Sequence, residues 1–276
     1  MSTAVRITIL VDNNSTRDDL ETEHGLALWI ENKDKKILFD TGQSDLLLQN
    51  AEKLGVNLAQ ANTIVLSHGH YDHSGGLTAA AELAPEAAIY AHPDVTKPRY
   101  SCGTKEPRFV GISESAKKTI EERKAIWTEK PLQLCSETAL TGRIPRTNDF
   151  EDVGGAFFTD ENCRNPDSLI DDQAMFIEAS GLIVILGCSH SGVVNTLDYI
   201  SKLTGHKKID TVIGGMHLVN ADKIRIENTI ETFKKYGIEK IIPMHCTGQK
   251  AVKDFKAAFG SKCLFSGVGG QITLGN

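Results

Sequence analysis

The segment Thr63-Ile-Val-Leu-Ser-His68-Gly-His70-Tyr-Asp72-His73-Ser-Gly-Gly76-Leu77 joins an apolar run to three histidines and one aspartate that lie within six residues. At the end of a strand, His68 and His70 point to the same side, because side chains alternate with a period of two. Where the chain turns into a helix, Asp72 and His73 can face a second point a few ångströms away. The segment therefore predicts two metal ions about 3.5–4 Å apart that share an activated water.

Two other interpretations of these histidines are weaker. The side chains could belong to a surface loop, or they could bind a single structural zinc ion. A structural zinc site usually closes with four ligands drawn largely from cysteine, which this segment lacks. Gly69, Gly75 and Gly76 also favour a functional site, because glycine permits tight backbone paths around a bound ion.

The bulk composition excludes several classes of partner. The chain has 276 residues and a formal charge of −6, and its basic residues form no stripe that could neutralise a phosphate backbone. No uncharged apolar stretch approaches the roughly 18–20 residues that cross a bilayer, and the first residues lack a signal-peptide pattern. We therefore expect a soluble, cytoplasmic protein that acts on a small molecule and binds neither nucleic acid nor membrane. The sequence does not specify its oligomeric state.

The six cysteines are scattered singly along the chain. Their spacing resembles neither a zinc ribbon nor a redox dithiol, and a disulfide framework is not expected in a cytosolic protein of this size. Most of them should pack as small buried hydrophobes. Cys188 and Cys246 differ from the others because each lies close to a histidine in the sequence.

The pattern of apolar residues predicts two mixed sheets with helices outside them, an α/β fold. Strands are expected at 6–11, 26–31, 36–39, 62–66, 174–179, 182–186, 211–213 and 240–243, and helices at 44–54, 193–203, 224–236 and 251–259. Ser180-Gly181 should form a hairpin turn, and the glycine-rich tail 263–274 should close a sheet edge. The range 93–158 is irregular, and we interpret it as an insertion or lid.

Five sequence motifs together resemble the metallo-β-lactamase superfamily. They are His-x-His-x-Asp-His after an apolar strand, Leu38-Phe39-Asp40-Thr41-Gly42 upstream, and downstream Gly187-Cys188-Ser189-His190-Ser191-Gly192, Gly214-Gly215-Met216-His217-Leu218 and Pro243-Met244-His245-Cys246-Thr247-Gly248. The later motifs resemble the branch of dihydropterin ribofuranosyl-aminobenzene phosphate synthase-like metal-dependent hydrolases. The resemblance implies a single domain over residues 1–276 with a four-layer αββα sandwich and metals at one edge of the sheets.

The resemblance also implies roles for individual residues. The first metal would take His68 and His70, and the second would take Asp72, His73 and His245. A water between the two metals would be the nucleophile.

This chain departs from the family pattern at Cys188, which stands where the family has a bridging aspartate. The histidine expected upstream of that strand is also missing. We infer that His190 completes the first metal site and that Cys188 is a thiolate ligand or bridge. A thiolate favours zinc over harder ions, with manganese and iron as alternatives.

Other residues leave alternatives open. We assign Asp72 and His217 to catalysis, although His217 could equally bind substrate, bind a metal or support a ligand. Asp40 should orient the site through hydrogen bonds, unless it only shapes a turn. Cys246 should pack in the core, and would be a soft ligand only in an unusual geometry.

The remaining histidines and the basic residues of the range 93–158 receive simpler interpretations. His24 and His206 should be solvated, and His92 should be an ordinary strand end. The basic cluster Arg99, Lys105 and Arg108 should be a solvated surface, with binding of an anionic group as the alternative.

The leading functional hypothesis is a hydrolase that uses a metal-activated water. Such a site attacks an ester, phosphoester, lactone or related centre and stabilises the oxyanion. The substrate could be a pterin-linked phosphoribosyl compound, which would make it anionic. The alternative is a non-hydrolytic redox or sensor protein that uses the same metal site.

Overall fold

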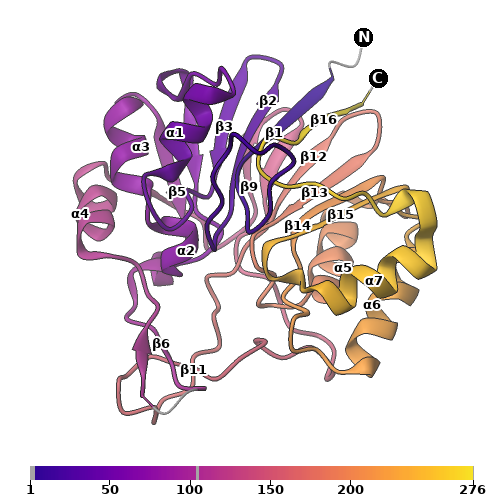
Figure 1. The fold of residues 1–276 in the computed structure, drawn as a ribbon. Coiled ribbons are helices and arrows are strands. Elements are labelled where there is room, and N and C mark those ends of the chain that lie inside the picture. Colours follow the sequence, from indigo (N-terminus) through magenta and orange to yellow (C-terminus); the bar gives the residue numbers. More distant parts are fainter. Residues whose placement is uncertain (1–3, 104–105, 276) are drawn as a thin grey trace.

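The apolar runs of the first half pair into a seven-stranded mixed sheet (Figure 1). The computed structural model describes residues 4–103 and 106–275. The tail closes one edge of this sheet as expected, because β16 pairs with β1. In spatial order, the strands are β16 (Gln271–Leu274), β1 (Val5–Val11), β2 (Ala27–Asn32), β3 (Lys35–Phe39), β4 (Thr63–Val65), β5 (Ala88–Ala91) and β8 (Ile126–Trp127).

A second mixed sheet of six strands faces the first. Its β12 and β13 form the expected hairpin around Ser180-Gly181, and β13, β14 and β15 run parallel. In spatial order, the strands are β15 (Lys240–Met244), β14 (Thr211–Gly215), β13 (Leu182–Leu186), β12 (Met175–Glu178), β10 (Thr138–Leu140) and β9 (Leu132–Cys135).

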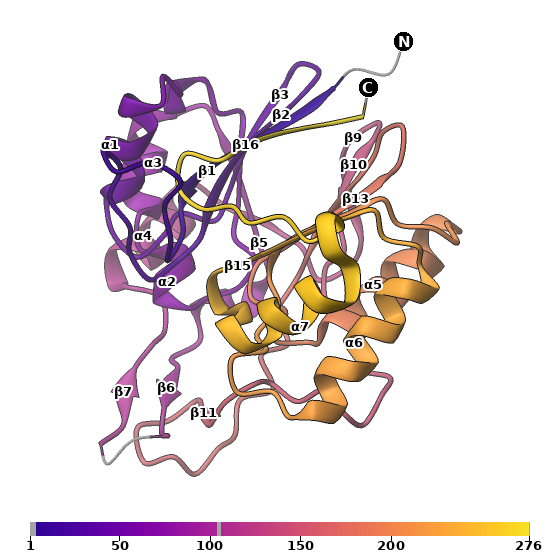
Figure 2. The same cartoon turned by 45° about the vertical axis from the view of Figure 1, so that its right-hand side comes forward.

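Helices cover the outer face of each sheet (Figures 1 and 2). The first sheet carries α1 (Leu46–Lys53), α3 (Leu77–Leu83) and α4 (Glu114–Glu122), and the second carries α5 (Val193–Thr204), α6 (Lys223–Lys235) and α7 (Gln249–Phe259). Short helices complete the set: α2 (Tyr71–Ser74), η1 (Leu58–Gln60), η2 (Pro93–Thr96), η3 (His245–Thr247) and η4 (Gly260–Lys262). Within the described residues, no helix combines the length and apolar character needed to cross a bilayer.

The sequence pattern of α5 explains why it lies on the sheet. Val193, Leu197 and Ile200 recur at helical spacing, and all three are fully buried in the cluster between the helices and the second sheet. Gly205 ends the helix with a φ of 73°, a conformation that glycine adopts without steric cost.

A third apolar cluster fills the space between the two sheets. It includes Ile30 of β2 and Ile183 of β13, whose side chains are almost completely buried. Sheets that bury both faces need apolar residues on both, which explains the nearly continuous apolar runs of β13 and β14. The predicted αββα sandwich is therefore confirmed.

The range 93–158, which we interpreted as an insertion or lid, contributes strands to both main sheets and also forms a third, small sheet. β8 joins the first sheet, β9 and β10 join the second, and β6 (Tyr100–Ser101), β7 (Arg108–Phe109) and β11 (Phe157–Phe158) form a small sheet of their own. Figures 1 and 2 show this small sheet extending beyond one end of the sandwich.

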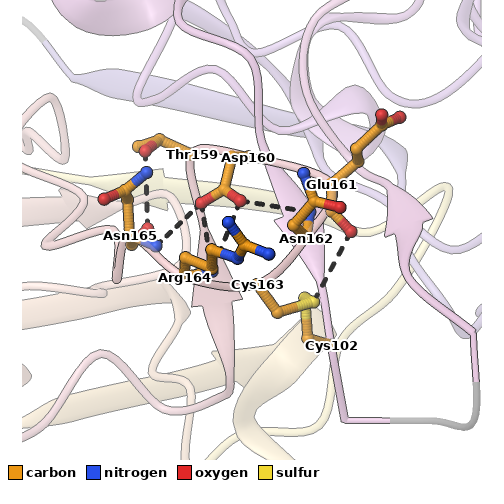
Figure 3. Close-up of a disulfide and its surroundings, with 8 residues drawn as sticks. All are labelled: Cys102, Thr159, Asp160, Glu161, Asn162, Cys163, Arg164 and Asn165. Carbon is orange, nitrogen blue, oxygen red and sulfur yellow. Dashed lines mark hydrogen bonds between the residues drawn. A yellow bond between two sulfur atoms is a disulfide. The ribbon is translucent and has the colours of Figure 1, made fainter.

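A disulfide between Cys102 and Cys163 ties the small sheet together (Figure 3). The expectation that these cysteines are single buried hydrophobes is wrong, because the pairing of β6 with β11 brings together two residues 61 positions apart. Beside the disulfide, the Asp160 carboxylate accepts backbone N–H groups of Asn162, Arg164 and Asn165 and so closes the turn.

The buried position of Ile30 gives a test of the sandwich core. Ile30→Ala should lower the free energy of unfolding by about 2–5 kcal/mol, because it leaves a cavity between two sheets. Urea denaturation measures the loss. Ile224→Ala is the matched control, since Ile224 is 61% exposed, and it should change the value by less than about 0.5 kcal/mol. Equal losses for both variants would contradict the placement of Ile30 in the core.

Candidate metal centre

The carboxyl ends of parallel strands meet at one edge of the sandwich and deliver the candidate ligands there. In open α/β sheets, functional residues gather at this edge. Asp40 follows β3, the segment of His68 follows β4, the segment of Cys188 and His190 follows β13, His217 follows β14, and His245 follows β15 directly.

Three imidazoles form the first cluster. His68 Nε2 lies 3.0 Å from His70 Nδ1, and His190 Nε2 lies 3.2 Å from the same nitrogen. All three side chains are buried. The structure thus brings His190 to His68 and His70, as the sequence predicted.

Two imidazoles and a carboxylate form the second cluster. His73 Nε2 lies 3.2 Å from His245 Nε2, and Asp72 Oδ2 lies 3.3 Å from His245 Nε2 and 3.8 Å from His73 Nε2. These residues come from α2 and from the turn after β15, which are far apart in the sequence.

Cys188 lies between the two clusters. Its Sγ is 3.1 Å from His73 Nε2 in the second cluster. It also forms one group with His68 and His190, whose candidate ligand atoms all lie within 4.8 Å of one another. A single sulfur therefore contacts the second cluster and lies near the first, in the position where the resemblance led us to expect a bridging carboxylate.

Hydrogen bonds at Nδ1 fix the orientation of four of the imidazoles. His73 Nδ1 lies 2.7 Å from Asp40 Oδ2, and His190 Nδ1 lies 2.8 Å from the Val153 carbonyl. His245 Nδ1 lies 2.9 Å from Asn13 Oδ1, and His68 Nδ1 lies 3.0 Å from Ser67 Oγ. Each partner can accept the Nδ1 proton, which leaves the Nε2 lone pair free in the neutral form of the ring. Lone pairs that face one another without a donor between them fit a bound cation, so these residues suit a divalent metal.

Asp40 supports both clusters, as expected. Its carboxylate accepts the Ser67 N–H and the Ser67 hydroxyl, each at 2.7 Å, in addition to the His73 ring. Its backbone has a φ of 58°, and Ser189, His217 and His245 at the same edge also have positive φ values. Such strained residues cluster at functional sites, where the surrounding structure holds them in place.

Burial and neighbouring charges set the protonation of the site. Burial holds the pKa values of His68, His70 and His190 well below their ordinary value, so these rings are neutral and can bind a cation. Burial would also lower the pKa of His73, but the carboxylates of Asp40 and Asp72 raise it to about 9. A cation that binds the second cluster must therefore displace a proton from His73.

Cys246 lies closer to this centre than the sequence suggested. Its Sγ is 3.4 Å from that of Cys188, and both side chains are buried. Together with His217, the two sulfurs form a further group of possible ligand atoms within 4.8 Å. Two buried thiols at this distance cannot both ionise easily, and burial raises the pKa of Cys188 well above its usual value.

His24 is solvated, as expected, but it also borders the second cluster. Its ring is about half exposed, but its Nε2 lies 3.1 Å from Asp72 Oδ2, and its ring centre lies 4.8 Å from that of His245. The loop between β1 and β2 carries His24 there, and Asn13 Nδ2 contacts its Nδ1 at 3.2 Å. Nothing in the polar sequence around His24 signals this placement, since it depends on the path of the loop.

The other histidines follow the sequence interpretation more closely. His206 is about half exposed, and its Nε2 lies 2.9 Å from Glu178 Oε2. His92 is buried and accepts the Asp94 N–H at the start of η2, which is a structural role.

The prediction that Arg99 belongs to a solvated surface is also wrong. Its side chain is 1% exposed and makes ion pairs with Asp167 at 2.8 Å and Asp171 at 2.7 Å. Asp171 also accepts the Gly69 N–H at 2.8 Å, so the buried arginine supports the loop between His68 and His70. Arg108 is exposed, with its guanidinium 5.6 Å from the ring centre of Tyr71, and Lys105 lies outside the described residues.

A segment from the small sheet covers the imidazoles. The Phe157 ring centre lies 4.9 Å from that of His70 and 5.3 Å from that of His190. The Gly154 carbonyl accepts His217 Nε2–H at 3.2 Å, and a Cβ at Gly154 would lie only 1.9 Å from the His217 ring. Glycine is therefore required where this segment crosses His217.

Comparisons with known proteins agree with this geometry. The family model described as the metallo-beta-lactamase superfamily matches residues 21–199. A Methanocaldococcus jannaschii protein named 7,8-dihydropterin-6-methyl-4-(beta-D-ribofuranosyl)-aminobenzene-5'-phosphate synthase is 34% identical, covering 86% of this chain and 85% of the relative. An uncharacterized protein of the same organism, MJ0448, is 35% identical over 89% of this chain and 92% of its own length.

Solved structures show the same fold. The structure of Tm1679, described as a metal-dependent hydrolase of the beta-lactamase superfamily, matches with a TM-score of 0.85 and 30% identity, covering 99% of this chain and 100% of that one. Igni18 of Ignicoccus hospitalis, described as a metallo hydrolase, matches with a TM-score of 0.58 at 14% identity, covering 99% of this chain and 100% of its own, which shows the fold alone.

Replacing Asp40 tests its support of the centre. Asp40→Asn should weaken metal affinity by roughly 10–100-fold, because one amide oxygen cannot serve the three donors that the carboxylate accepts. Competition with a chromophoric chelator measures the affinity. Asp34→Asn, in an exposed turn, is the control and should leave it unchanged. An unchanged affinity in Asp40→Asn would contradict this role.

Replacing Arg99 tests the buried ion pairs. Arg99→Met should lower the free energy of unfolding of the metal-free protein by about 3–5 kcal/mol, because Asp167 and Asp171 would lose their buried partner. Arg17→Met removes an exposed arginine that pairs with Asp19, and it should have little effect on the same urea denaturation curve. Similar curves for the two variants would show that burial of the Arg99 pairs is unimportant.

Proposed function

Because this chain belongs to the metallo-beta-lactamase superfamily, we propose that it is a dinuclear metal-dependent hydrolase that acts on an ester, phosphoester, lactone or related small molecule. The observation that carries the proposal is the pair of buried clusters whose ring nitrogens converge on either side of Cys188. The similarity of the whole chain to a solved metal-dependent hydrolase supports it.

The donor set fits two divalent cations, with zinc preferred over manganese or iron. His68, His70 and His190 would hold the first cation, and Asp72, His73 and His245 the second, with Cys188 as a ligand between them. Imidazole and thiolate donors suit a borderline-soft ion such as zinc. Bound there, the cations would supply Lewis acidity and lower the pKa of a water toward neutrality.

Asp72 and His217 are the side chains we assign to proton handling. Burial by itself would raise the pKa of Asp72, but His73, His24 and His245 lower it well below its usual value, so the carboxylate stays ionised and can accept a hydrogen bond from the attacking water. His217 donates from Nε2 to the Gly154 carbonyl, which leaves Nδ1 as a proton acceptor. That Nδ1 atom is buried and has no hydrogen-bond partner among the described residues.

We propose that the substrate is a small molecule, and one relative suggests its class. The relative named as a pterin-linked aminobenzene phosphate synthase makes a compound of that kind a candidate substrate here, for cleavage or for condensation. We propose a small molecule rather than nucleic acid or membrane, in keeping with the charge of −6, and a cytoplasmic location. Purified protein tested against phosphodiester, lactone and thioester panels separates these substrate classes.

A non-hydrolytic redox or sensor role is the second candidate. The adjacent thiols of Cys188 and Cys246 favour it, because such a pair can be oxidised. Metal analysis by mass spectrometry distinguishes the two: bound iron without turnover indicates a redox role, and two zinc equivalents with turnover indicate hydrolysis.

Removal of one ligand from each cluster tests the dinuclear site. In His68→Ala and in His245→Ala, metal affinity and activity should fall together. Each should fall by more than the roughly 10–100-fold that is typical when a residue supporting a ligand is lost. Metal content and hydrolysis are measured on the same samples. His206→Ala, which changes an exposed histidine, is the control and should keep both. Full metal occupancy in either cluster variant would disprove that ligand assignment.

Cobalt substitution tests the thiolate. The cobalt-loaded protein should show a thiolate-to-metal charge-transfer band that Cys188→Ser abolishes and Cys246→Ser retains, because the Cys188 sulfur contacts the second cluster and lies near the first. If the Cys188→Ser variant keeps the band, Cys188 is not the ligand.

A further inference from the structure

We propose that a groove beside His245 binds the aromatic, anionic part of the substrate, an inference that rests on the hydrolase function proposed above. The groove has a volume of about 690 Å³. It lies among the end of β15, the start of α7, the segment 263–266 and the loop that follows β1. Its size is typical of pockets that hold small molecules.

The groove reaches the candidate metal centre through two residues. His245 and Asn13 both line it, and Asn13 Oδ1 accepts the Nδ1 proton of the His245 ring at 2.9 Å. On its other side, the same ring presents Nε2 to Asp72 and His73. A molecule in the groove therefore lies against a side chain that we assign to the second cation.

Exposed apolar side chains gather along the groove. Phe265 is 73% exposed, Val219 54% and Leu264 37%. Single exposed apolar residues are common, but several around one concave site indicate a ligand surface. Phe265 offers a flat ring on which an aromatic group can stack.

The charge of the groove is opposite to that of the chain. The protein carries a formal net charge of −6, yet none of the described residues that line the groove is Asp or Glu. Two lysines, Lys253 and Lys256, line it. Lys256 donates to the Cys263 carbonyl at 2.9 Å, which fixes its ammonium at the wall. No described residue pairs with the Lys253 ammonium, so it is free to bind an anion. A local positive charge beside apolar surface selects a ligand that has both an aromatic ring and a negative group.

The experiment uses the full chain and measures binding separately from catalysis. Anilinonaphthalene sulfonate, an anionic aromatic fluorophore, is titrated into metal-free and metal-loaded protein, and phenyl phosphate, phenol and inorganic phosphate compete against it. Phenyl phosphate should displace the probe better than either phenol or inorganic phosphate, in both forms of the protein. Because the metal-free form cannot hydrolyse, this result is independent of whether the proposed function is correct.

Matched variants locate the binding. Phe265→Ala should raise the Kd of phenyl phosphate about tenfold, and Lys253→Gln about threefold with a weaker salt dependence. Trp127→Ala on β8 and Lys202→Gln on α5 change an exposed aromatic residue and an exposed lysine outside the groove, and both should bind as the unsubstituted protein does. Circular dichroism confirms that each variant is folded.

Three results would overturn the proposal. The first is unchanged binding in both Phe265→Ala and Lys253→Gln. The second is displacement by phenol or by inorganic phosphate that equals displacement by phenyl phosphate. The third is a dimer that Phe265→Ala converts to a monomer, since a second copy of the chain would then occupy the groove.

Discussion

The hydrogen bond between Asp40 and His73 is the contact on which the rest of the centre depends. It joins the end of β3 to α2, and through Ser67 the same carboxylate also reaches the segment of His68. Similar Nδ1 contacts hold His190 and His245, so the Nε2 atoms of four rings point inward. Without these contacts each ring could rotate or carry its proton on the other nitrogen, and the donors would no longer converge.

This arrangement brings like partial charges together in a buried space. Two groups of imidazoles and two thiols lie close together, and burial lowers the pKa of His68 and raises the pKa of Cys188. A bound cation relieves the unfavourable contacts, because it interacts with every lone pair at once. Binding to the folded state alone also stabilises that state by mass action, so stability and metal content should be linked.

The sandwich and most of the candidate ligands could be predicted from the sequence, because the signals for both are local. Apolar runs located the strands, and four ligand-type residues within six positions located the edge. Arg99 was misjudged because its role comes from tertiary placement, since distant aspartates pair with it. His24 is solvated and Cys246 is buried as expected, but their neighbours could not be foreseen: a loop brings His24 to Asp72, and Cys188 approaches Cys246 from another strand. The Cys102–Cys163 pair likewise depends on contacts between segments that no local pattern reveals.

The disulfide has a consequence for how molecules reach the buried imidazoles. The segment that lays Phe157 over His70 and His190 is paired with β6 and is joined to it covalently through Cys163 and Cys102. A segment anchored in this way cannot swing far from the rings without separating β6 from β11. At the second cluster, by contrast, the half-exposed His24 borders Asp72 and presents an imidazole to solvent beside the buried rings.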